Sequence, residues 1–125
     1  MNPDKFSPKS RLGSFKYAFS GLSYLLAHEH NARIHFVAAI IVIILGFAFK
    51  VDPFEWCVLM MVIGLVFLTE LINSSLEAIA DVAEPRQNEK IRIAKDYSAA
   101  AVLIAAIISV IVGGLIFIPR LISLI

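Results

Sequence analysis

The sequence has little cysteine and little charge. Cys57 is the only cysteine, so an intrachain disulfide is excluded. Charged residues make up 17% of the chain, against about 25% in average soluble domains. The six glycines form no GxxxxGK[ST] run, which excludes a P-loop or protein-kinase mechanism. The basic N-terminus lacks a clean apolar core and a small-residue cleavage site, so we do not expect a removable signal peptide.

Apolar residues dominate the composition instead. They make up 59% of the 125 residues, and the mean hydropathy is +0.84. Three long apolar segments cover residues 34–51, 54–80 and 98–118, and a membrane helix needs about 20 residues. The sequence therefore predicts an all-α integral membrane protein with three transmembrane helices.

The remaining segments are more polar. Residues 12–33 mix aromatic and aliphatic side chains with charged ones, which predicts an amphipathic helix on the membrane surface. We expect residues 1–10 to be disordered, and residues 82–97 to form a turn and a short surface helix. No repeat or second domain is visible, so residues 1–125 are predicted to form a single domain.

Basic residues predict the orientation in the membrane. Nine of the eleven lie before the first apolar segment or between the second and third, namely Lys5, Lys9, Arg11, Lys16, Arg33, Arg86, Lys90, Arg92 and Lys95. Only Lys50 and Arg120 lie at the other side. By the positive-inside rule, the N-terminus and the second loop face the cytoplasm, and the protein is expected in the inner (cytoplasmic) membrane.

A polar stripe interrupts the end of the second apolar segment. Glu70, Asn73, Glu77 and Asp81 are spaced three, four and four residues apart, within an arc of about 80° on a helix. Carboxylates at membrane depth are costly and usually face a protein interior or a water-filled site. The stripe therefore indicates a cation-binding site. The alternative is a polar seam between helices, although three acids in one seam would repel each other.

Further ionisable residues are expected at the same membrane face. Glu29 lies on the predicted surface helix, and Lys95 and Asp96 lie just before the third span. Acids from two helices suit Mg²⁺ together with phosphate oxygens, lysine suits a phosphate, and another carboxylate suits a general base toward a hydroxyl. These are the components of phosphoryl transfer.

Two other interpretations of the ionisable residues were weighed. A small proton- or ion-conducting membrane protein would use the stripe as a relay, but a relay does not need a phosphate-binding lysine at the rim. His28, His30 and His35 are spaced two and five residues apart, which does not make a good helical face for a transition metal.

The polar motifs resemble those of a known family. The run ELINSSLEAIAD at residues 70–81, the AKD at 94–96 and the AAVLIA at 100–105 resemble the prokaryotic diacylglycerol kinase family, which also contains undecaprenol kinases. The resemblance implies a homotrimer of subunits with three membrane helices and an N-terminal surface helix. It also implies sites between neighbouring subunits and transfer of the γ-phosphate of ATP to a membrane lipid alcohol.

The resemblance also implies a role for each residue of the candidate site. Glu70 matches the general base, and Glu29 and Glu77 match carboxylates that hold the nucleotide phosphates through Mg²⁺. The remaining matches are nucleotide-binding residues of the same site, namely Tyr17, Asn73, Asp81, Lys95 and Asp96.

A few positions bear on the lipid acceptor. Asn31 and His35 look like the undecaprenol kinase branch, whereas the diacylglycerol branch usually carries an acid at the position of His35 and a serine at that of Ala99. We therefore favour undecaprenol over diacylglycerol as the acceptor. Both present a primary hydroxyl, so the chemistry is the same.

Two packing expectations complete the interpretation. Trp56 is expected in the aromatic belt at the outer membrane interface. Gly113 and Gly114 are expected to permit close packing between helices.

Overall fold

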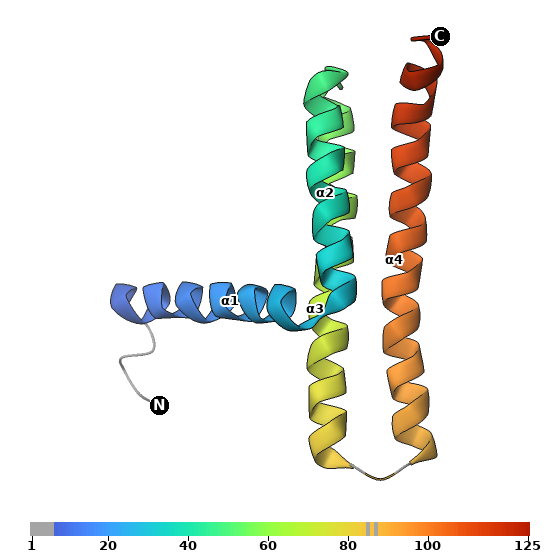
Figure 1. Ribbon diagram of the computed structural model, residues 1–125. Helices are drawn as coiled ribbons and strands as arrows, with labels where there is room; N and C mark the ends of the chain where they lie inside the picture. Colours follow the sequence, from blue (N-terminus) through green and yellow to red (C-terminus); the bar gives the residue numbers. More distant parts are fainter. Residues whose placement is uncertain (1–6, 85, 87) are drawn as a thin grey trace.

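The computed structural model describes residues 7–84, 86 and 88–125, and it contains four helices. They follow one another as α1 (Pro8–His28), α2 (His30–Ala48), α3 (Pro53–Ala83) and α4 (Glu89–Ile122). The described part of the chain contains no strand, which confirms the all-α prediction. The long helices α2, α3 and α4 run up, down and up in an open bundle (Figure 1).

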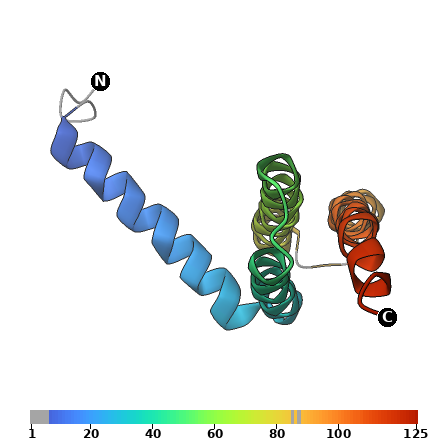
Figure 2. The same cartoon turned by 90° about the horizontal axis from the view of Figure 1, so that it is seen from above.

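The N-terminal helix, α1, points sideways out of the bundle. It lies across the axis of the long helices and projects away from them when the molecule is seen from above (Figures 1 and 2). α3 and α4 make the most extensive contact and both extend past the level of α1 (Figure 1). The segment between α3 and α4 therefore lies at one end of the bundle, and the C-terminus lies at the other.

Three of the four helices are long and apolar enough to cross a membrane, namely α2, α3 and α4. Large apolar side chains are exposed along all three, among them Phe47 on α2, Met61 on α3 and Leu115 on α4. Exposure of so much apolar surface to water is unfavourable, so these faces are suited to lipid or to a protein partner. The chain is therefore a membrane protein with three candidate spans.

The N-terminal helix begins earlier than expected. Ser7 caps α1 by accepting a hydrogen bond from the backbone N–H of Ser10 at 3.1 Å, and Pro8 occupies the first helical position, which suits its fixed φ. Residues 8–10 are thus helical rather than disordered, and residues 1–6 lie outside the described part. The amphipathic character and surface location of α1 stay predictions.

The first two helices meet at Glu29. Its backbone is extended (φ −103°, ψ 113°), so α1 ends at His28 and α2 begins at His30, four residues before the predicted start at Ile34. Glu29 therefore lies at the corner between α1 and α2. At this corner the Glu29 carboxylate lies at the side of the bundle, which a place within α1 would not ensure.

The helix after the polar segment also differs from the prediction. Asn88 caps α4 by accepting hydrogen bonds from the N–H groups of Lys90 and Ile91 at 2.9 and 3.3 Å. From Glu89 the helix continues to Ile122 without interruption. The predicted short surface helix is therefore the first part of α4, because no residue after Asn88 breaks the helix before the apolar span.

An apolar core forms at the end of the bundle remote from the stripe. Its buried members are Val51, Leu59, Ile116 and Phe117. An ion pair that sequence analysis missed lies close by in the chain. Arg120 near the end of α4 donates two hydrogen bonds to the carboxylate of Glu55 at the start of α3, at 2.6 and 2.8 Å. This fork-to-fork geometry joins the two helix ends.

Close helix packing occurs at Gly46, not at the predicted glycine pair. A Cβ atom at Gly46 would lie 2.5 Å from the Trp56 ring, whereas one at Gly113 would meet nothing within 4 Å and one at Gly114 only Ile118 of the same helix. Within the chain the prediction for Gly113 and Gly114 is therefore wrong. Trp56 fills the space beside Gly46, so it has a packing role as well as its predicted place at the interface.

This contact predicts opposite effects for two glycine substitutions. Gly46→Ala should lower the melting temperature in detergent, because the new methyl group displaces the Trp56 ring. Gly64→Ala is the matched control, because a Cβ there meets nothing within 4 Å and alanine favours a helix over glycine by about 1 kcal/mol. Equal or raised melting temperatures for both variants would contradict the close approach of α2 to Trp56.

Candidate active site

The polar stripe lies on the half of α3 that is remote from the apolar core. Glu70 is almost completely buried, with 2% of its surface exposed. Three buried side-chain atoms in the described residues lack a hydrogen-bond partner, and all three lie here: Glu70 Oε1, Asn73 Oδ1 and Ser74 Oγ. Buried polar atoms are normally paired, since leaving them unpaired costs free energy. This helix face is therefore built to meet another polar group.

Ser74 was not singled out in the sequence. It follows Glu70 by four residues and precedes Glu77 by three, so the spacing alone places it on the same helix face. Serine is also common in ordinary apolar helices, where its hydroxyl bonds to the preceding turn. Only the missing partner of its buried hydroxyl distinguishes Ser74 from such a residue.

A histidine from the neighbouring helix approaches Glu70. Nε2 of His35 on α2 lies 3.4 Å from Glu70 Oε1, but the geometry does not make a hydrogen bond. The His35 side chain is 24% exposed, against 3% for that of Glu70. In the sequence, His35 distinguishes the two branches of the family and was also considered, with His28 and His30, as a transition-metal ligand. The sequence lacked a signal for this contact, because residues 35 apart meet only through the antiparallel pairing of α2 and α3.

Two further carboxylates that were expected at the site act electrostatically on Glu70. Glu29 at the corner of α1 and α2, and Glu77 two turns along α3, both lie within electrostatic range of Glu70. Among the described residues no group of three or more acidic, histidine or cysteine side chains forms a complete metal cage. Mg²⁺ usually takes one or two carboxylates and completes its shell with water and phosphate oxygens. Carboxylates such as those of Glu29 and Glu77 are the oxygen ligands that such a shell uses.

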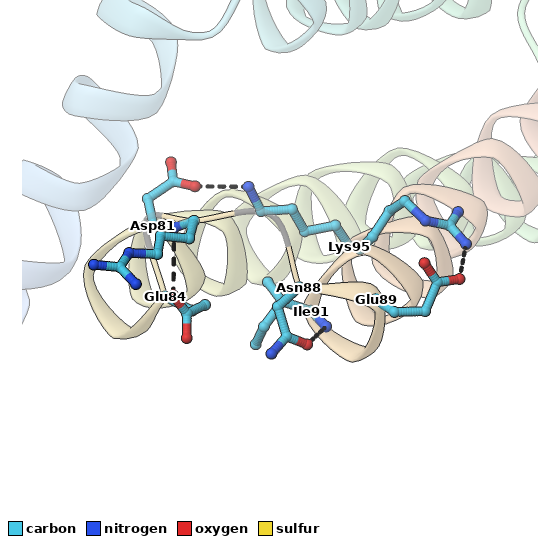
Figure 3. A pocket seen from close by; sticks show the side chains of 8 residues that line it. Asp81, Glu84, Asn88, Glu89, Ile91 and Lys95 are labelled. Atoms are coloured by element: carbon cyan, nitrogen blue, oxygen red, sulfur yellow. Dashed lines mark hydrogen bonds and ion pairs between the residues drawn. The ribbon is translucent and has the colours of Figure 1, made fainter.

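A lysine from α4 meets the far end of the stripe. Lys95 Nζ lies 2.6 Å from Asp81 Oδ1, and Figure 3 shows the two side chains reaching toward each other from α4 and α3. Lys95 is also within electrostatic range of Glu77. The structure thus joins two predicted nucleotide-binding residues directly.

A polar cavity of about 590 Å³ opens beside this ion pair. Its lining carries both signs of charge, namely Asp81, Glu84, Arg86, Glu89, Arg92 and Lys95 (Figure 3). Asn88, which caps α4, also lines it. Arginine and lysine are the side chains that bind phosphate groups, so Arg86 and Arg92 join Lys95 as candidates for contacting a nucleotide. Neither Arg86 nor Arg92 was among the site residues expected from the sequence, and residue 87 beside Arg86 lies outside the described residues.

Asp96 has a different neighbour from the one its sequence position suggests. It accepts a hydrogen bond from Arg92 at 2.9 Å, and Arg92 also donates to Glu89 at 2.6 Å. All three side chains are well exposed on α4. Asp96 therefore reaches the cavity only through Arg92, one turn before it on the same helix.

Tyr17 lies apart from the stripe in the single chain. It lies on α1 with 79% of its surface exposed. Twelve residues separate it from Glu29, which corresponds to about 18 Å along a helix. α1, which carries Tyr17, projects away from the bundle (Figure 2).

The chain is similar in sequence to several known proteins. A sequence model of prokaryotic diacylglycerol kinase matches residues 16–117, which include every residue of the candidate site. A diacylglycerol kinase of Synechocystis is 40% identical over 114 residues, which cover 90% of this chain and 65% of that protein. This chain thus spans slightly less than two thirds of that relative's length.

Other relatives match more evenly in length. An undecaprenol kinase of Bacillus subtilis is 36% identical over 86% of this chain and 88% of its own. A diacylglycerol kinase of Escherichia coli K12 is 33% identical over 76% of this chain and 78% of its own. The chain belongs to the prokaryotic diacylglycerol kinase family.

Proposed function

We propose that this protein is an integral-membrane lipid kinase, which transfers the γ-phosphate of ATP to the primary hydroxyl of a membrane lipid alcohol, undecaprenol by preference. One observation carries the proposal. Glu70 is a buried carboxylate with an unpaired oxygen, on an apolar helix, with Glu29 and Glu77 in electrostatic range. Such a carboxylate suits a general base for a hydroxyl that is presented from the lipid.

The residues divide the work between two ends of the stripe. Glu70, nearer the apolar span, accepts the proton of the lipid hydroxyl. Glu29 and Glu77 hold Mg²⁺, which when bound neutralises charge on the phosphate oxygens. Lys95, oriented by Asp81 at 2.6 Å, contacts a phosphate from the side of α4. The order along α3 therefore runs from the acceptor at Glu70 to the nucleotide at Asp81.

The cavity at the ends of α3 and α4 is the proposed site for the nucleotide. It adjoins Lys95 and Asp81, and it offers the guanidinium groups of Arg86 and Arg92. We place this end of the bundle in the cytoplasm, where ATP is available, because the basic residues are concentrated there. Asn73 and Asp96 belong to the same site, Asn73 through its unpaired oxygen and Asp96 through Arg92.

The acceptor is proposed from the sequence. Asn31, His35 and Ala99 favour undecaprenol, and the Bacillus subtilis relative bears that name. The names of the Synechocystis and Escherichia coli relatives favour diacylglycerol, which is the alternative acceptor. Their chemistry does not separate them, because each offers one primary hydroxyl at the membrane interface.

We further propose that the protein acts as a homotrimer, as the family resemblance implies. The unpaired atoms of Asn73 and Ser74 and the exposed apolar faces of the long helices support a protein partner. A neighbouring subunit could also bring its own Tyr17 to the nucleotide. Mass measurement of the native protein in detergent tests the assembly, and a monomer with full activity would contradict it.

A direct rate comparison tests the function. Purified protein in mixed micelles, supplied with Mg²⁺ and γ-labelled ATP, should label undecaprenol faster than diacylglycerol. A faster rate with diacylglycerol would overturn the choice of acceptor but leave the kinase. Failure to label either lipid, together with proton flux in liposomes, would contradict the kinase and support a proton-conducting protein.

A further inference from the structure

The burial of Glu70 creates a problem that the proposed function leaves open. A general base gains a proton in every turnover and must lose it before the next one. The Glu70 side chain is only 3% exposed, so its direct access to water is small. A neighbouring group that is more exposed to solvent provides a route for the proton.

The described chain offers one candidate in direct contact with Glu70. The ionisable groups that face Glu70 are His35 from α2, Glu29 from the corner of α1 and α2, and Glu77 from α3 itself. The two acids are the proposed metal ligands and are committed to the nucleotide. His35 is the group in contact, with Nε2 at 3.4 Å from Oε1, and its side chain is 24% exposed. The His35 ring therefore contacts both the buried oxygen of Glu70 and the solvent.

The local geometry fits a contact that forms during turnover. In the resting chain Glu70 Oε1 lacks a hydrogen-bond partner, although His35 Nε2 is near it. An ionised carboxylate can only accept hydrogen bonds, whereas a protonated carboxyl group can also donate its O–H to a ring nitrogen that accepts. Once Glu70 is protonated, its O–H can donate to that nitrogen, and the contact can shorten. Catalytic hydrogen bonds are often long before the reacting complex forms.

We infer that His35 is a positioning residue that takes the proton from Glu70 after phosphoryl transfer, an inference that rests on the proposed function. The lipid O–H proton passes to Glu70, and the electron pair of that oxygen forms the new bond to the γ-phosphorus. The bond from this phosphorus to the bridging oxygen breaks, and its electron pair leaves with ADP. The proton then moves from Glu70 to His35 Nε2 and from the ring to water.

A second feature makes the role of the ring testable. His35 also lines a cavity of about 80 Å³ between α2, α3 and α4, whose other walls include Ala39, Val66 and Ser109. Removing the imidazole enlarges a space that already exists. Free imidazole can therefore be expected to enter the site of a His35→Ala variant and to act as the missing group.

The experiment compares His35 variants in the lipid kinase assay. His35→Gln keeps a side chain of similar size that cannot carry the proton, so kcat should fall about 10²-fold while KM for MgATP stays within about twofold. His35→Ala should lose a similar factor and recover activity in added imidazole, which should not help His35→Gln. His28→Gln is the matched control, because His28 is exposed and bonds to the backbone oxygen of Tyr24.

The outcomes separate this inference from the proposed function. Wild-type protein that labels no lipid would refute the function, whereas active wild-type protein with an equally active His35→Gln variant would refute only the role of His35. If His35→Gln does not bind MgATP, His35→Ala decides: rescue by imidazole supports the inference, and failure of rescue overturns it. In a Glu70→Gln background, His35→Gln should cost no further activity, since His35 acts through Glu70. An independent loss there would also overturn the inference.

Discussion

Glu70→Gln should remove lipid phosphorylation and leave MgATP binding intact. The substitution keeps the size of the side chain but removes the group that accepts the hydroxyl proton. Loss of a general base typically lowers the rate by about 10²–10⁴-fold. We expect kcat to fall by that factor. MgATP affinity, measured by calorimetry in detergent, should stay within about twofold, because Glu29 and Glu77 remain to hold the metal.

The neighbouring residue on α3 provides the control for this variant. Thr69 donates its hydroxyl hydrogen bond within its own helix, to the backbone oxygens of Leu65 and Val66 at 3.0 and 2.9 Å. Thr69→Val changes polarity at nearly constant shape beside Glu70, and it should retain most of kcat. A Glu70→Gln enzyme with near-normal kcat would show that another group takes the proton.

Glu77→Gln should instead weaken the binding of MgATP. Its carboxylate lies within electrostatic range of both Glu70 and Lys95, where the proposed metal meets the phosphates. A glutamine oxygen is neutral and binds Mg²⁺ much more weakly. Changing even a residue that supports a metal ligand costs about 10–100-fold in metal affinity, so loss of a ligand should weaken MgATP binding by at least that range.

Removal of the metal separates this effect from a general disturbance of the site. With EDTA present, wild-type protein and Glu77→Gln should bind ATP with the same weak affinity, whereas in Mg²⁺ they should differ. The Glu70→Gln protein is the matched comparison, since it changes a carboxylate on the same helix face without touching the metal. Equal MgATP affinities for Glu77→Gln and wild type would remove Glu77 from the metal site.

Much of the helical framework could be predicted from the chain alone. The apolar segments are long and uninterrupted, and in lipid the backbone must satisfy its own hydrogen bonds, so helices were the expected result. The stripe from Glu70 to Asp81 followed from helical spacing, which depends only on local geometry. Helix ends were less predictable, because the extended backbone at Glu29 and the cap at Asn88 depend on single residues.

Sequence patterns could not predict the contacts between helices. The Gly46–Trp56 approach and the Glu55–Arg120 ion pair join residues whose distance apart is set by loop length and helix rotation. A glycine, or a charged residue near a helix end, does not by itself indicate such a contact, because both also occur without partners. The glycine pair at residues 113–114 illustrates the converse, a motif without a neighbour in the chain.

The sequence by itself determined the helices, the membrane class and the face on which Glu70, Asn73 and Glu77 lie. Those features depend on amino-acid composition and on helical periodicity, and both are properties of the local sequence. Tertiary structure alone decided that Glu70 is buried, that His35 contacts it and that Lys95 pairs with Asp81. Burial and pairing arise only when α2 and α4 pack against α3, since each depends on atoms contributed by distant parts of the chain.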